Sequence, residues 1–110
     1  MLKLLFICTQ NKLRSPTAEQ IFSTYRNIET DSAGLGNDAC VTLSTEQIMW
    51  ADIIFVMEKT HKMKLTKNFR QYIKKQRIIC LDIPDNYSFM QTELIERLKT
   101  KVEPFLKTKE

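Results

Sequence analysis

The chain has 110 residues, of which 43% are hydrophobic, and a formal net charge of +4 at pH 7. This length fits one domain spanning 1–110, and nothing in the sequence supports two. No apolar stretch or signal-peptide pattern predicts a membrane partner. Its three cysteines, Cys8, Cys40 and Cys80, have neither disulfide-framework nor zinc spacing, which favours a reducing, cytoplasmic location.

The first predicted strand, 3–8, delivers Cys8 to a loop that precedes a predicted helix over 16–25. Five residues separate Cys8 from Arg14. Backbone N–H groups of residues 9–14 can point inward around an anion, and the same field favours a thiolate at Cys8. The planar guanidinium of Arg14 can hold two phosphate oxygens. The pattern predicts a cysteine-dependent phosphatase.

A simpler interpretation of Cys8 must be weighed against this one. Cysteine is a common small apolar residue of protein cores, and one Cys and one Arg at this spacing occur by chance in many chains. The position of Cys8 between a strand-like run and a helix start favours the catalytic interpretation.

The rest of the chain continues to alternate between strands and helices. Further strands are predicted at 27–33, 53–57 and 77–81, and further helices at 44–50, 59–75 (divided near Asn68) and 92–106. This alternation predicts a three-layer α/β fold, in which helices cover both faces of a parallel sheet. Ligands of such sheets bind beyond the carboxyl ends of the strands, where Cys8 is expected.

Positive charge is concentrated in residues 59–81, which contain eight lysines and arginines and no Asp or Glu. Such a segment is usually a solvated helix face. The functional interpretation is a surface that attracts an anionic substrate or partner, and nucleic acid is only weakly supported because regularly interleaved aromatic residues are absent. His61, the only histidine, is expected at the surface, with the pocket rim as the alternative.

A phosphatase also needs an acid that protonates the leaving oxygen. Residues 82–87 follow the last predicted strand and contain Asp82 and Asp85. Asp and Pro are ordinary turn residues, so this stretch alone indicates a loop. Opposite a Cys/Arg anion loop it predicts the acid, and the spacing does not choose between the two carboxylates.

With these motifs in place, the chain resembles the low-molecular-weight protein tyrosine phosphatase family, in particular a short, bacterial-type branch. The matching stretches are 5–8, Asn11, 14–19, 31–34, 51–58 and 84–87. The resemblance implies a four-stranded parallel sheet in the order 2-1-3-4 and a hydrolase that acts through a phosphocysteine without metal or other cofactor. It also implies a phosphorylated protein (phosphotyrosine) or small molecule as substrate, with phosphate, sulfate or vanadate as site ligands.

The resemblance further implies the roles of individual residues. Cys8 would be the nucleophile, Arg14 would hold the phosphoryl oxygens, and Asp85 would match the family's acid, with Asp82 as the alternative. Substrate contacts are implied for Thr9, Gln10, Asn11, Lys12, Leu13, Ser15 and Tyr87, and bracing of the loop for Asn11, Ser15 and Ser32.

Several departures from the family pattern matter. The chain is shorter than typical members between residues 36 and 50, which removes a helix and a histidine that helps to brace the phosphate loop. Leu13 replaces a second loop cysteine, Asn86 replaces a proline, and Gln10 stands where glycine is frequent. These differences predict a more open site and allow substrates other than phosphotyrosine.

Two alternatives to a tyrosine phosphatase stay open. The same chemistry can act on a nucleic-acid, nucleotide or metabolite phosphate drawn in by the basic segment. The chain can also be a phosphate-binding regulatory module without turnover.

Overall fold

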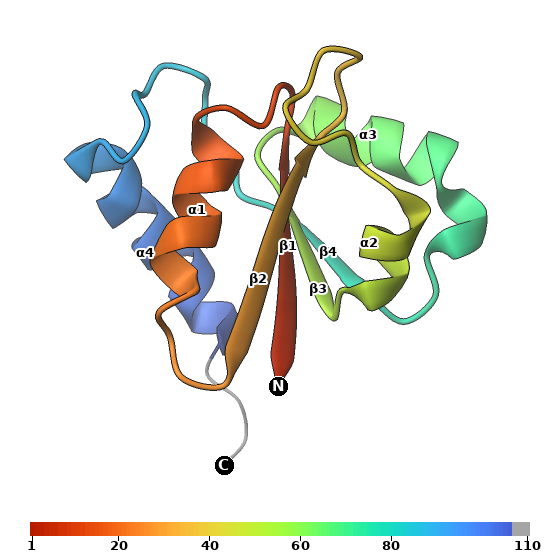
Figure 1. Cartoon of the computed structure of the whole chain (residues 1–110), viewed down its shortest axis with the longest axis horizontal. Coiled ribbons are helices and arrows are strands. Elements are labelled where there is room, and N and C mark those ends of the chain that lie inside the picture. Colours follow the sequence, from red (N-terminus) through yellow and green to blue (C-terminus); the bar gives the residue numbers. More distant parts are fainter. Residues whose placement is uncertain (107–110) are drawn as a thin grey trace.

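Four parallel strands form the central sheet of the computed structural model, which describes residues 1–106 (Figure 1). The strands are β1 (Leu2–Cys8), β2 (Ile28–Gly34), β3 (Ile53–Val56) and β4 (Arg77–Cys80). Their order is β2-β1-β3-β4, and every pair is parallel. The predicted topology is confirmed, and β1 lies inside the sheet with a neighbour on each side.

Helices cover both faces of this sheet, as predicted. They are α1 (Arg14–Phe22), α2 (Thr45–Trp50), α3 (Lys59–Asn68) and α4 (Thr92–Leu106), with a short 3-10 helix, η1 (Arg70–Tyr72). Figure 1 shows α1 and α4 on one side of the sheet and α2 and α3 on the other. No helix within residues 1–106 is long and apolar enough to cross a membrane.

The alternating side chains of β1 explain the two layers of core. Leu4, Phe6 and Cys8 face the side of α1 and α4, whereas Leu5 and Ile7 face the side of α2 and α3. All five are buried, so the strand is apolar on both faces, as a central parallel strand should be. Burial of each large side chain stabilises the fold by roughly 1.5–3 kcal/mol, which fixes Cys8 at the end of a rigid element.

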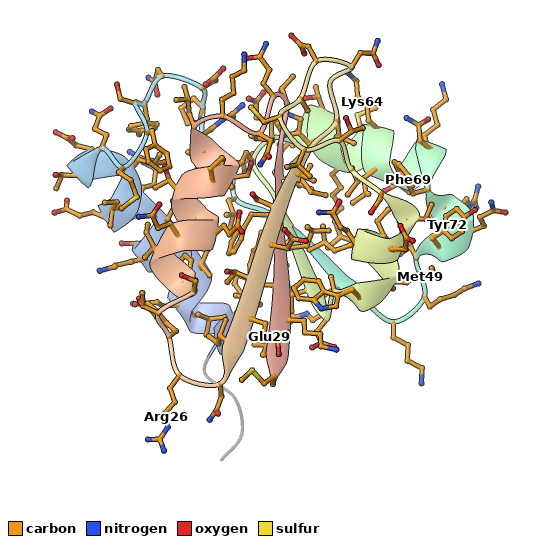
Figure 2. The ribbon with its side chains drawn as sticks, in the orientation of Figure 1. Arg26, Glu29, Met49, Lys64, Phe69 and Tyr72 are labelled. Carbon is orange, nitrogen blue, oxygen red and sulfur yellow. The ribbon has the colours of Figure 1, made fainter. Side chains whose placement is uncertain are left out.

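The predicted long helix at 59–75 is divided, as the sequence indicated near Asn68. The chain leaves α3 at Phe69, whose φ of −122° and ψ of 22° are not helical. Phe69 and Tyr72 then pack against the core on the α2 side, and Tyr72 shares a surface pocket with Met49 of α2; Figure 2 labels all three on this side of the sheet.

Candidate active site

A cavity of about 170 Å³ opens at the carboxyl end of β1, where the strand passes into α1. It is lined by Cys8, Thr9, Gln10, Lys12, Leu13, Arg14 and Asp85. Figure 1 shows the loop between β1 and α1 at the edge of the sheet where the parallel strands end. The structure therefore brings the cysteine and arginine of the first motif together with one carboxylate from the loop after β4.

Cys8 lies at the inner end of this cavity and is only 3% exposed. The backbone N–H of Asn11 donates to Cys8 Sγ at 3.2 Å, and the Ser15 hydroxyl lies 2.9 Å from the same sulfur. Because Ser15 Oγ also accepts from the Asn11 amide at 2.9 Å, its own proton is free to point at the sulfur. Two donors are therefore aimed at Sγ.

Asn11 stabilises a tight bend in the loop between β1 and α1, of which it is a part. Its backbone is left-handed, with φ of 57°, a conformation that asparagine tolerates better than most residues. Its side-chain amide donates to Ser15 Oγ and to Ser32 Oγ, each at 2.9 Å. Ser32 in turn donates to the Glu19 carboxylate. Asn11, Ser15 and Ser32 are all buried under the loop and do not line the cavity.

Arg14 begins α1 and is only 2% exposed. One terminal nitrogen, Nη1, donates to Glu58 Oε2 at 2.5 Å and to the carbonyl oxygen of Ile83 at 2.7 Å. The Nε atom lies 3.8 Å from Asp85 Oδ1. The two hydrogen bonds at Nη1 hold the guanidinium in place, and Arg14 still lines the cavity.

A second segment, residues 34–40, supports the loop between β1 and α1 (residues 9–13, the phosphate loop) through backbone hydrogen bonds. Its N–H groups donate to successive loop carbonyls: Leu35 to Cys8, Gly36 to Thr9 and Cys40 to Gln10, at 3.0, 2.8 and 3.0 Å. A Cβ atom on Gly34 would lie 2.6 Å from Thr9 O, so only glycine fits. The chain's two glycines, Gly34 and Gly36, were the signal for this close approach.

His61 corrects the expectation of a surface histidine. It is 3% exposed, and its Nε2 atom lies 2.8 Å from Thr9 Oγ1. The Glu58 N–H donates to Nδ1 at 3.1 Å, which assigns the ring proton to Nε2. Burial, followed by the charge of Arg14, lowers the pKa of His61 from its ordinary value. The loop therefore has a histidine brace, supplied by α3.

The two aspartates of the loop after β4 differ in position. Asp85 lines the cavity, and its side chain is 60% exposed. Asp82 is also exposed but accepts from Cys80 Sγ at 3.3 Å and has a left-handed φ of 53°. Tyr87 packs against the part of the core to which α4 contributes and does not line the cavity.

The sequence model of the family described as low molecular weight phosphotyrosine protein phosphatase matches residues 3–50. This match confirms the resemblance to that family. The matched stretch contains Cys8 and Arg14, the two residues on which the expectation of a cysteine-dependent phosphatase rests. The comparison with curated proteins finds no relative.

Solved structures share the fold over nearly the whole chain. A low molecular weight protein tyrosine phosphatase from T. tengcongensis is 21% identical with a TM-score of 0.80, covering 96% of this chain and 98% of that one. Vibrio vulnificus Wzb, in complex with benzylphosphonate, is 20% identical with a TM-score of 0.77 over 96% and 97%. The YwlE arginine phosphatase from Geobacillus stearothermophilus is 22% identical with a TM-score of 0.71 over 100% and 99%. At these identities the likeness establishes the fold.

Proposed function

We propose that the protein hydrolyses phosphomonoesters through a phosphocysteine at Cys8, in the manner of a protein tyrosine phosphatase. One observation carries the proposal. A buried sulfur with two hydrogen-bond donors lies in the same small cavity as a fixed guanidinium and a carboxylate. Nucleophile, phosphate-binding group and acid are the three parts that this reaction needs.

In the first step, the Cys8 thiolate attacks the phosphorus atom, and an S–P bond forms as the bond to the leaving oxygen breaks. Loop N–H groups and the free donors of Arg14 hold the equatorial oxygens of the transferring phosphoryl group. Asp85, in its protonated form, donates its proton to the leaving oxygen. Its place at the exposed mouth of the cavity supports this role, because the leaving group departs toward solvent.

In the second step, water attacks the phosphocysteine and the S–P bond breaks. Asp85, now a carboxylate, accepts the proton of the attacking water, and Cys8 leaves as a thiolate. The two donors on the sulfur, from Asn11 and Ser15, favour Cys8 as a leaving group as well as a nucleophile. Inorganic phosphate is the product, and phosphate, sulfate and vanadate should occupy the same cavity.

The test is hydrolysis of para-nitrophenyl phosphate by the wild type and by Cys8→Ser, under reducing conditions and without added metal. We expect turnover by the wild type and a loss of at least about a thousandfold in Cys8→Ser, because the hydroxyl is a far weaker nucleophile than the thiolate. Cys8→Ser should still bind vanadate, since Arg14 and the loop remain. Full activity in Cys8→Ser would overturn the mechanism.

The substrate class needs a separate measurement. Among the proteins with this fold are tyrosine phosphatases and an arginine phosphatase, so phosphotyrosyl and phosphoarginyl peptides of one sequence should be compared. We expect the phosphotyrosyl peptide to give the larger kcat/KM, because an acid at Asp85 assists departure of a phenoxide. A preference for the phosphoarginyl peptide would keep the phosphocysteine and change the substrate.

A further inference from the structure

A groove of about 810 Å³ runs along α3 to the end of β4. Four cations line it, Lys59, Lys62, Lys67 and Arg70, together with Met63, Thr66 and Cys80. We call these seven residues the basic groove. It contains most of the cations that α3 and η1 contribute to the basic segment, and Figure 2 shows a further lysine of α3, Lys64, on the same helix.

The basic groove carries little compensating negative charge: Asp82, which accepts from Cys80 Sγ at 3.3 Å, lies at its β4 end. None of its four cations forms an ion pair within residues 1–106, and no carboxylate is among its lining residues. The groove also has an apolar part, because the side chain of Met63 is 71% exposed. A long, flexible thioether suits varied apolar side chains of a partner. Its chemistry therefore fits a partner that is acidic and partly apolar.

One end of the basic groove adjoins the candidate active site. Lys59 directly follows Glu58, whose carboxylate accepts from Arg14. Cys80 ends β4, and the loop that follows it carries Asp85 into the cavity. A chain that enters the cavity with one side chain can thus continue into the groove.

We propose that the basic groove binds an acidic polypeptide segment next to the phosphorylated residue of a protein substrate. This inference rests on the proposed phosphatase function. Cations spaced along α3 match carboxylates of an extended peptide and raise its rate of association. A single-stranded nucleic acid fits less well, because no aromatic side chain lines the groove for bases to stack on.

The experiment compares two phosphotyrosyl peptides, one with glutamates on both sides of the phosphotyrosine and one with glutamines in their place. The test variant is Lys62→Glu with Lys67→Glu, two exposed residues of α3. The matched control is Lys74→Glu with Lys75→Glu, which has the same change of charge within the basic segment but lies outside the groove. Para-nitrophenyl phosphate measures the chemical step in every variant.

We expect the wild type to prefer the glutamate peptide by about tenfold in kcat/KM at low salt, and the preference to shrink as salt screens the charges. The α3 double variant should lose the preference, the control should keep it, and kcat for para-nitrophenyl phosphate should stay within about twofold in both. Equal kcat/KM for the two peptides in the wild type would overturn the proposal. An equal loss of the preference in both double variants would also overturn the proposal, because the overall positive charge of the protein would then explain the effect.

A binding measurement separates this proposal from the proposed function. Fluorescence anisotropy of a labelled glutamate peptide with unphosphorylated tyrosine reports on the groove without turnover. Weaker binding to the α3 double variant than to the control would support peptide binding in the basic groove, whether or not the protein hydrolyses para-nitrophenyl phosphate. A lack of hydrolysis would overturn only the proposed phosphatase function. Tighter binding of a 5′-phosphorylated oligonucleotide than of the peptide, lost in the α3 double variant, would overturn the peptide in favour of nucleic acid.

Discussion

His61 of α3 donates a hydrogen bond from Nε2 to Thr9 Oγ1 in the phosphate loop, with 2.8 Å between the two atoms. The same ring accepts the Glu58 N–H at Nδ1, and Glu58 binds Arg14. The neutral ring serves both contacts. A protonated ring would place an N–H at Nδ1 against the Glu58 N–H, so acid should break the hydrogen bond between Glu58 and His61, whereas Nε2 can still donate to Thr9.

The stability of the protein should therefore depend on the protonation of His61. Burial lowers its pKa in the folded protein, and the charges of Arg14 and Lys64 add to this, whereas Glu58 and Asp85 oppose it. Above the ordinary pKa of 6.5 the ring is neutral in both states. As the pH falls through 6.5, the unfolded chain binds a proton that the folded chain does not, so the free energy of unfolding decreases.

We expect His61→Gln to lose part of this pH dependence. Urea unfolding at about pH 7.5 and about pH 5.5 measures the free energy of unfolding on both sides of the transition. One proton changes the folding equilibrium at most about tenfold per pH unit, which sets the largest effect to expect. The wild type should be more stable than His61→Gln at the higher pH, and the gap should narrow at the lower one. The same gap at both values would mean that His61 does not titrate between the two states.

Gly34→Ala should destabilise the protein and impair the phosphate loop. The new Cβ would lie 2.6 Å from Thr9 O and 2.7 Å from the Cβ of Ala39, and backbone must move to relieve the first contact. We expect a loss of about 1–3 kcal/mol in the free energy of unfolding, as in other overpacked sites. Gly36→Ala is the matched control, because its nearest contact, also Thr9 O, is 3.0 Å away. Equal stability of the two variants would contradict the steric argument.

Asn11 contributes both a backbone conformation and two hydrogen bonds, and two substitutions separate them. Asn11→Ala places an alanine at φ of 57° and removes the donors to Ser15 and Ser32, which together should cost about 2–4 kcal/mol. Asn11→Gly should cost about 1–2 kcal/mol less, because glycine accepts this conformation. Thermal or urea unfolding gives both numbers. If the two variants are equally unstable, the left-handed backbone carries no cost of its own.

Asp85→Asn should slow the cleavage of alkyl phosphates about 10²–10⁴-fold, the usual range for loss of a general acid. Esters with good leaving groups, such as para-nitrophenyl phosphate, should suffer less in the first step because their oxygen needs little protonation. Asp82→Asn, outside the cavity, serves as the control. If Asp82→Asn gives the leaving-group dependence and Asp85→Asn does not, the acid has been assigned to the wrong carboxylate.

The sequence predicted the features that depend on local pattern. Apolar runs marked all four strands, and the placement of Cys8 at the end of the first followed from them. The start of α1 was predicted at residue 16 but lies at Arg14. Leu13 precedes it and has no side-chain cap, so the sequence held no signal for the earlier start.

The features that the sequence could not predict depend on residues far apart in the chain. His61 and Thr9 are separated by 52 positions. Leu65, one turn further along, indicates the inner face of α3 for His61, but nothing nearby in sequence indicates that its ring meets Thr9. The bracing of Thr9 and Gln10 by residues 34–40 likewise arises because β2 pairs with β1 in a register that sets Gly34 beside Cys8. Only the assembled sheet brings these segments together.

The pairing of Arg14 with Glu58 also affects how a substrate reaches the cavity. Two carboxylates, those of Glu58 and Asp85, already face this guanidinium, and the dipoles of the loop amides act only over a short range. The cavity alone therefore attracts a distant phosphate dianion only weakly, and long-range attraction has to come from the net charge of +4. Different parts of the surface thus attract the substrate and carry out the reaction. Raising the ionic strength should therefore lower the rate of substrate binding, whereas kcat should stay constant.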